Sequence, residues 1–270
     1  IRDKQTGESV YYKKHESGLN IYIMPRKGYS SSYAIFGTKY GSVDSEFIVP
    51  GETEITKVPD GIAHYLEHKM FDQPDGSNVF DKFSAYGGEA NAFTSFNMTA
   101  YLFSCTENFE KNLETLMDYV QSPYFTNESV EKEQGIIGQE IGMNEDAPES
   151  RIFENLMVAL YRNHPVQTPI LGTRETIAKI TPDLLPACHN AFYRPKNMLL
   201  CVIGDVDPNE VVSIAEATLP HEDTAQVTRV DTWQEEMTCP ESITTCQITA
   251  SMTPKCSNIS EREKQVQLLF

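Results

Sequence analysis

Residues 58–71 of the chain read VPDGIAHYLEHKMF. Apolar residues recur every four positions in this stretch, at Ile62, Leu66 and Met70, which is the spacing of one helix face. Asp60 precedes the first of them and is of a residue type that caps helix N-termini. We therefore predict a helix over the rest of this stretch, with Asp60 as its N-cap.

The predicted helix carries the pattern H-x-x-E-H, at His64, Glu67 and His68. At about 100° per residue the two imidazoles lie one turn and some 40° apart, on the side that faces away from the apolar residues. Two imidazoles so placed can bind one zinc ion, and Glu67 can take a proton from a water that the metal activates. The alternative is that both histidines are solvated or capping residues. A catalytic zinc site also needs a third protein ligand, which another element must supply.

Charge and composition restrict the partners of the protein. The 270 residues include 22 Lys and Arg against 39 Asp and Glu, a formal net charge of −17. A surface this acidic repels nucleic-acid phosphates and anionic lipid headgroups, so neither nucleic acid nor a membrane is an expected partner. No apolar stretch approaches the ~18 residues of a membrane span. The six cysteines form no Cys-x-x-Cys pair, which favours reduced packing residues of a cytoplasmic protein over disulfides, the alternative.

The periodicity along the chain predicts an α+β domain followed by a second, incomplete one. The apolar pattern disappears after about residue 221 and the sequence becomes polar and acidic, as in a linker. We expect one domain over 1–222, a linker over 223–242 and the truncated start of a second domain over 243–270. The expected strands are 15–24 (a hairpin), 32–36, 90–103 and 198–203; the expected helices are 109–120, 127–143 and 152–160, with two more starting at Thr181-Pro182 and Asp207-Pro208.

The motifs resemble one family over about residues 10–220. They are the stretch 58–71, Glu89 to Ser95, Glu131 to Ile141, and Phe192 to Asp205. Together they resemble the inverzincins, the pitrilysin and mitochondrial-processing-peptidase metallopeptidases, and most of all the bacterial cytoplasmic members with two such domains in tandem. The resemblance implies a mostly antiparallel sheet packed against helices.

The resemblance also implies the remaining site residues. Glu140 matches the third zinc ligand of the family, and Glu133, seven residues before it, matches a group that orients a ligating imidazole. Seven residues are nearly two helical turns, so both carboxylates fall within about 20° of one face. Either alone is more often a solvated helix charge. Three glycines in the same stretch predict that another backbone packs closely against this helix; they are Gly135, Gly138 and Gly142.

By the same resemblance the protein is a zinc-dependent endopeptidase acting on peptides or small unfolded proteins. Zinc held by His64, His68 and Glu140 lowers the pKa of its bound water, and Glu67 is the general base. The family binds an extended peptide along an edge strand, which matches Asn91, Ala92 and Phe93 here; an interior strand of ordinary packing is the alternative.

The expected partners are a peptide substrate and either the second half of the same chain or a homologous subunit. The chain as given can therefore bind zinc yet cleave weakly or not at all. Two other functions fit the residues. One is a non-catalytic subunit that binds peptides or a partner, against which the complete set of zinc-site residues argues. The other is a zinc hydrolase with a non-peptide substrate.

Overall fold

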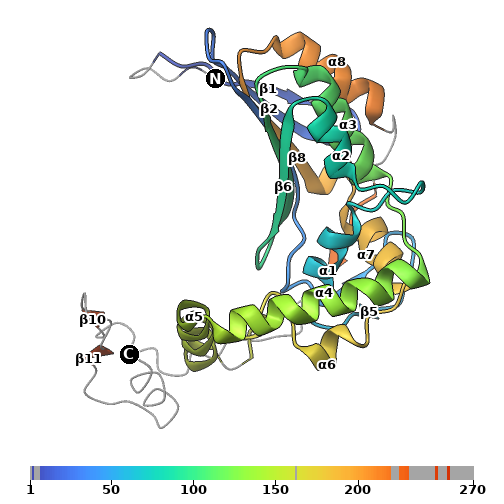
Figure 1. The fold of residues 1–270 in the computed structure, drawn as a ribbon, viewed down its shortest axis with the longest axis vertical. Coiled ribbons are helices and arrows are strands. Elements are labelled where there is room, and N and C mark those ends of the chain that lie inside the picture. Colours follow the sequence, from blue (N-terminus) through green and yellow to red (C-terminus); the bar gives the residue numbers. More distant parts are fainter. Residues whose placement is uncertain are drawn as a thin grey trace.

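The main sheet confirms the α+β class. The structure is a computed structural model that describes residues 2, 7–161, 163–219, 225–230, 247–248 and 254–255. The sheet has six strands, in the order β1-β2-β8-β3-β7-β6, and every neighbouring pair is antiparallel except β2 and β8 (Figure 1). The strands are β1 Tyr11–Lys14, β2 Asn20–Pro25, β8 Met198–Gly204, β3 Ser32–Thr38, β7 Thr99–Cys105 and β6 Gly88–Thr94.

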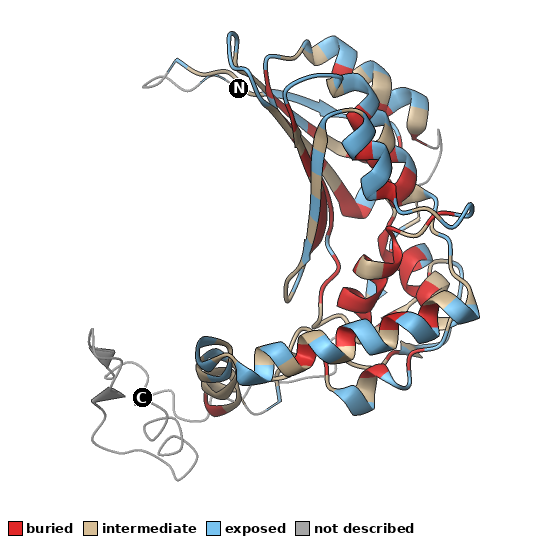
Figure 2. Ribbon diagram, in the orientation of Figure 1, coloured by how far each residue is buried: buried red, intermediate tan, exposed pale blue. Residues whose placement is uncertain are grey.

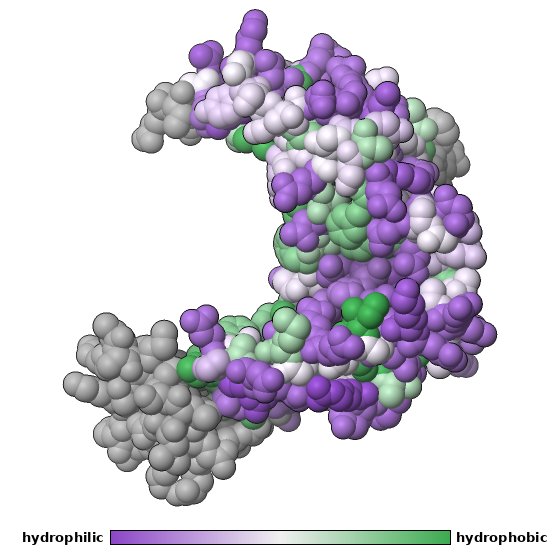
Figure 3. Space-filling model, in the orientation of Figure 1, coloured by the Kyte–Doolittle hydropathy of each residue, from purple (hydrophilic) through white to green (hydrophobic). Residues whose placement is uncertain are grey.

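Helices cover one face of this sheet and leave the other open. The covering helices are α2 (Val79–Ala85), α3 (Phe109–Gln121) and α8 (Pro208–Thr218), which contact β6, β7 and β2 respectively (Figure 1). The opposite face lines a broad hollow, where Figure 3 shows apolar side chains among polar ones. Tyr22 and Ile203 are each 37 % exposed, which is unusual for such large apolar side chains in a sheet.

A second group of helices forms the other wall of the hollow. The long helix α4 (Asn127–Asp146) runs along this wall and is followed by α5 (Pro148–Leu160) (Figure 1). Helix α1 (Ile62–Lys69) lies between the sheet and α4 and contacts α4, α7 and strands β6 and β7. Figure 2 shows α1 and its neighbour α7 (Leu184–Phe192) largely buried. The remaining short helices are α6 Arg174–Ile177, η1 Pro165–Gln167 and η2 Pro195–Asn197.

Two predicted helix starts are wrong. Helix α1 begins at Ile62 with Gly61, not Asp60, as its N-cap. Gly61 has a φ of 90°, and a Cβ on it would lie 2.4 Å from the carbonyl oxygen of Leu171, so close backbone contact sets this start. The helix expected from Thr181 begins later, at Leu184. Its Pro186 then falls in the first turn, where a missing N–H costs no hydrogen bond.

The glycines of α4 do not serve the close packing that we predicted. A Cβ on Gly135 or Gly138 would meet nothing within 4 Å, and one on Gly142 would meet only the guanidinium of Arg174. Gly135 and Gly138 instead line a cavity of about 450 Å³ between α4 and α6. The prediction failed because a glycine permits another backbone to approach the helix but does not require one to be there.

Residues 225–230 pack on the same unit. Strand β9 (Thr228–Arg229) pairs with β4 (Glu46–Ile48), which also pairs with β5 (Thr56–Lys57), and Val227 belongs to the core. Within the expected linker and second domain, 223–270, the structure describes residues 225–230 and the short pair β10 (Gln247–Ile248) and β11 (Pro254–Lys255), and the rest lies outside the described residues. The division of the chain at residue 222 stays a prediction. Among the described helices, none combines the length and apolar character needed to cross a membrane.

Candidate metal centre

Helix α1 supplies three polar side chains in a buried setting. The helix is enclosed by the sheet, α4 and α7, so even the side that faces away from its apolar residues is largely covered. His64 and Glu67 are each only 7 % exposed. Ionisable groups are seldom buried this deeply without partners or a metal ion, so the surroundings of these side chains decide what they can do.

Helix α4 brings two carboxylates to the same place. Its first turn is fixed by a capping box in which Thr126 and Ser129 each bind the other's backbone N–H. Val130 and Ile137 are buried on the side of the helix that faces α1. Glu133 and the partly exposed Glu140 lie near the same side of the helix and nearly two turns apart, as their seven-residue spacing predicts.

Donor atoms of His64, His68 and Glu140 converge on one point. One ligand atom from each lies within 4.8 Å of those of the other two. Nε2 of His64 is 3.7 Å from Oε1 of Glu140, and Nε2 of His68 is 3.5 Å from Oε2. Tetrahedral zinc with bonds of ~2.1 Å holds neighbouring ligand atoms ~3.4 Å apart. Two imidazoles and a carboxylate at these separations fit zinc, and they match the donor set of catalytic sites that keep a fourth position open.

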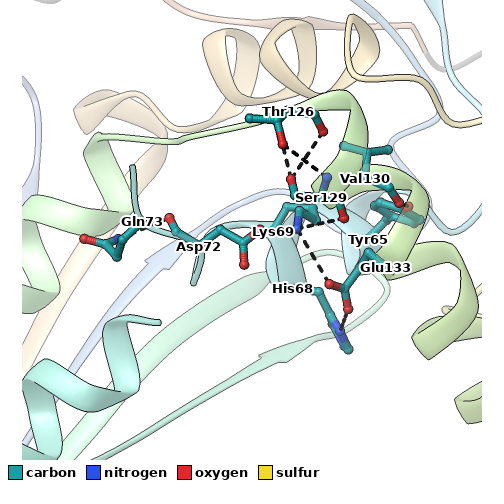
Figure 4. Close-up of polar contacts among 9 residues, drawn as sticks. All are labelled: Tyr65, His68, Lys69, Asp72, Gln73, Thr126, Ser129, Val130 and Glu133. Atoms are coloured by element: carbon teal, nitrogen blue, oxygen red, sulfur yellow. Dashed lines mark hydrogen bonds and ion pairs between the residues drawn. The ribbon is translucent and has the colours of Figure 1, made fainter. Parts of the chain in front are cut away.

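Glu133 reaches the outer nitrogen of one ligand. Its Oε1 accepts a hydrogen bond from Nδ1 of His68 at 2.9 Å (Figure 4). A carboxylate in this position keeps the proton on Nδ1 and leaves the lone pair on Nε2, the nitrogen that faces Glu140. This is the place that the resemblance assigned to Glu133.

Glu67 is held from the opposite side by the sheet. Thr94, the last residue of β6, donates its hydroxyl to Oε2 of Glu67 at 2.6 Å. Burial raises the pKa of Glu67, and the hydrogen bond from Thr94 opposes that rise. A carboxylate whose pKa is raised is a better proton acceptor, so the environment of Glu67 suits a general base.

The two histidines differ in their affinity for protons. Burial, with a smaller contribution from His68, lowers the pKa of His64 to about 3. Burial also acts to lower the pKa of His68, but the hydrogen bond and charge of Glu133, with the charges of Glu67 and Glu140, raise it overall. The pKa of Glu133 is lowered: burial acts to raise it, and His68 and then Lys69 outweigh that effect. The site thus concentrates negative charge around one imidazole, which suits a divalent cation.

The expected substrate strand is an edge strand. Among the described strands, β6 has β7 as its one sheet neighbour and lies at the end of the strand order, which makes it an edge strand and not an interior one. Asn91 and Phe93 point to the open face, while Ala92 packs against the core. The side-chain oxygen of Asn91 accepts a hydrogen bond from the exposed backbone N–H of Ala92 at 2.8 Å.

The structure brings together every residue predicted for the zinc site. It also adds two residues that sequence reasoning missed. Thr94 lies within the motif Glu89 to Ser95, but nothing in the sequence showed that its hydroxyl contacts Glu67. Lys69 follows His68 directly and is 1 % exposed, and the only sequence signal was a charged residue where the apolar pattern of the helix continues.

Two sequence models of one family match the chain. The model described as "Insulinase (Peptidase family M16)" matches residues 50–174, and the model described as "Peptidase M16 inactive domain" matches residues 179–247. The boundary between the matches does not divide the structure. Strand β8 lies in the second match and β7 in the first, and both pair with β3 in the main sheet.

Similar proteins carry zinc-protease names. The "Uncharacterized zinc protease YmfH" of Bacillus subtilis is 48 % identical over 239 residues, which are 87 % of this chain and 56 % of that protein. An "Uncharacterized zinc protease" of Rickettsia bellii is 33 % identical over 215 residues, covering 77 % of this chain and 49 % of that protein. The chain therefore spans about half the length of the curated relatives it matches.

Solved structures agree with the fold. An M16-like peptidase from Alicyclobacillus acidocaldarius matches with a TM-score of 0.79 and 39 % identity, over 85 % of this chain and 54 % of that one. A protease from Helicobacter pylori matches with a TM-score of 0.72 and 22 % identity, over 85 % of this chain and 55 % of that one. At 22 % identity the second match shows the fold alone.

Proposed function

The chain belongs to peptidase family M16, the insulinase family, and we propose that its protein is a zinc-dependent endopeptidase that hydrolyses peptides or small unfolded proteins. The observation that carries the proposal is the convergence of His64, His68 and Glu140, whose donor atoms all lie within 4.8 Å of one another. The zinc-protease names of the relatives support the metal and the reaction class. They say nothing of the substrate.

The proposed mechanism gives each side chain one task. His64, His68 and Glu140 would hold the metal, and Glu133 would keep His68 oriented. A bound zinc ion would acidify water and polarise a peptide carbonyl. Glu67 accepts a proton from water as the new C–O bond forms, and returns it to the departing amine as the C–N bond breaks. The hydroxyl of Thr94 already donates to Oε2, and we therefore assign the proton transfer to Oε1.

The substrate would bind as an extended strand beside β6. An edge strand offers unpaired backbone groups to a peptide, and the exposed backbone N–H of Ala92 is already within reach of a polar acceptor, the side chain of Asn91. Asn91 and Phe93, on the open face, would contact the side chains of the peptide. Because β6 also carries Thr94, a peptide bound there would lie next to the general base.

We further propose that the active protein closes its hollow with a second unit. The matched residues make up only about half of each relative, so we infer that the second unit is either the rest of the same chain or a homologous subunit. The open, partly apolar face of the sheet would then be covered.

The test uses the full-length protein and two variants. Zinc content is measured in wild type, His68→Ala and Glu67→Gln, and each is incubated with a peptide library whose products are identified by mass spectrometry. We expect about one zinc ion in wild type and in Glu67→Gln, little in His68→Ala, and cleavage by wild type alone. Zinc in wild type without any cleavage would overturn the peptidase proposal and favour a non-catalytic peptide-binding subunit. Absence of zinc from the wild type would overturn the metal centre.

A further inference from the structure

Lys69 is the most deeply buried charged side chain among the described residues. It ends α1 and is 1 % exposed. Its ammonium group donates a hydrogen bond to the carboxylate of Asp72, and another to the backbone oxygen of Ser129 at 3.2 Å. It also forms an ion pair with Oε2 of Glu133, at 3.7 Å (Figure 4). Asp72 lies on the turn after α1, and Ser129 and Glu133 lie near the start of α4.

A buried ammonium group is costly unless partners compensate its charge. Removing one partner of a buried pair leaves an uncompensated charge out of water, which strongly destabilises the fold. Lysine is otherwise among the residue types least often fully buried. A plain packing position would be filled more favourably by an apolar side chain. The position of Lys69 therefore calls for an explanation in terms of its partners.

The partner closest to the chemistry is Glu133. Its two carboxylate oxygens are engaged separately, Oε1 by Nδ1 of His68 and Oε2 by the ammonium of Lys69. Two contacts on opposite oxygens fix the rotation of the carboxyl group, which a single hydrogen bond would leave free. Lys69 also contacts Ser129, one turn before Glu133, so it holds the backbone of α4 as well as the side chain.

The arrangement acts on one of the two histidines. Nδ1 of His64 is buried with no hydrogen-bond partner among the described residues, whereas Nδ1 of His68 has Glu133. On its other side, Nε2 of His68 lies 3.5 Å from Oε2 of Glu140. The series Lys69, Glu133, His68 and Glu140 thus links the end of α1 to the metal ligand on α4.

We propose that Lys69 is a positioning residue of the metal centre. By holding Glu133 with one oxygen toward His68, it fixes the orientation of the His68 ring and the register between α1 and α4, the two helices that supply the ligands. This inference rests on the proposed zinc site. It predicts that Lys69 affects the affinity for zinc directly, and catalysis only through the metal.

The test is a double-mutant cycle on zinc affinity in the full-length protein. Lys69→Met, Glu133→Gln and the double variant are titrated with zinc against a chromophoric chelator, and the visible spectrum of the cobalt-substituted proteins is recorded. Lys132→Met is the matched control, since Lys132 is the exposed lysine next to Glu133. We expect Lys69→Met to bind zinc about tenfold more weakly and to alter the cobalt spectrum, as partners of metal ligands do. The control keeps wild-type affinity.

The double variant separates positioning from general stability. If Lys69 acts through Glu133, the double variant binds zinc no more weakly than Glu133→Gln alone, because the loss has already occurred. Additive losses, or wild-type affinity in Lys69→Met, would overturn the proposal. Lys69→Gln provides a second, polar replacement; if neither it nor Lys69→Met folds, Lys69 supports the fold as a whole and the proposal fails. A wild-type protein that binds no zinc would overturn the proposed function itself, so the two failures are distinct.

Discussion

Nδ1 of His68 lies 2.9 Å from Oε1 of Glu133, a residue 65 positions further along the chain and on a different helix. The contact joins α1 to α4 at the place where both helices contribute to one cluster of donor atoms. It fixes which nitrogen of His68 carries the proton, and so which nitrogen can bind a metal ion.

Replacing Glu133 by Gln should weaken zinc binding. The amide can still accept a hydrogen bond from His68, but it lacks the charge that favours a basic imidazole, and such changes usually cost 10- to 100-fold in metal affinity. Titration against a chelator measures the change. Glu131→Gln, on the exposed side of the same helix, is the control and should bind zinc as the wild type does. Equal affinity in both variants would contradict the assigned role of Glu133.

Replacing Thr94 by Val should lower kcat without removing zinc. Thr94 donates to Oε2 of Glu67, and hydrogen bonds to charged groups contribute ~1.5–3 kcal/mol, so a loss of about tenfold or more is expected. Thr94→Ser keeps the hydroxyl and should recover most of the activity. Steady-state kinetics with metal analysis of each sample distinguishes this outcome from loss of the metal. A Val variant with wild-type kcat would show that Glu67 needs no such support.

Replacing Gly61 by Ala should destabilise the fold. The residue has a φ of 90°, and its new Cβ would lie 2.4 Å from the carbonyl oxygen of Leu171. We expect a loss of about 2 kcal/mol or more in the free energy of unfolding. Gly76→Ala is the control, because Gly76 has a φ of 80° but open space around it, and should cost about 1 kcal/mol. Chemical denaturation measures both. Equal losses would mean that the contact with Leu171 does not matter.

His189 should make stability depend on pH. Burial lowers its pKa to about 4, although its ring nitrogen Nε2 contacts the carbonyl oxygen of Val120 at 3.0 Å. In the unfolded chain the pKa is ~6.5, so the neutral form stabilises the fold above pH ~6.5. As the pH falls from 6.5 to 4 the unfolded state takes up a proton that the folded state does not, and about 3 kcal/mol is lost.

The variant His189→Gln isolates this effect. Glutamine can still donate to Val120 but does not titrate, so the difference in unfolding free energy between wild type and variant should change by about that amount between pH 6.5 and 4. The measurement is denaturant unfolding of the zinc-free proteins at a series of pH values. A difference that stays constant over this range would show that the pKa of His189 is not lowered.

The sequence predicted local structure well and long-range pairing poorly. Helix α3 follows from apolar spacing and formed where expected. The hairpin expected over 15–24 also formed, but its first strand, β1, lies earlier in the chain, at Tyr11–Lys14. The insertion of β8 between β2 and β3 does not follow from any local pattern, because its partners are more than 150 residues away. The start of α1 was misplaced for the same reason, since Gly61 is fixed by contact with Leu171.

The residues of the candidate site could be predicted from the sequence, but the contacts that hold those residues in place could not. The H-x-x-E-H spacing and the seven-residue interval between Glu133 and Glu140 depend only on helix geometry, which sequence expresses directly. The contacts of Thr94 and Lys69 depend on how β6 and α4 pack against α1, and no periodicity encodes that packing. A lysine in a helix is expected to be exposed to solvent, so only the structure, in which Lys69 is buried, pointed to its proposed role.

The placement of the donor atoms on α1 and α4 has a consequence for how the protein is made. Between these helices the chain forms α2, the hairpin of β6 and β7, and α3. Of the three proposed ligands, His64 and His68 are therefore synthesised first, and the set is complete only once α4 has been made and has docked. If zinc binds at the proposed site, loading would follow the docking of α4, and the bound metal would report that the intervening segments have reached their places.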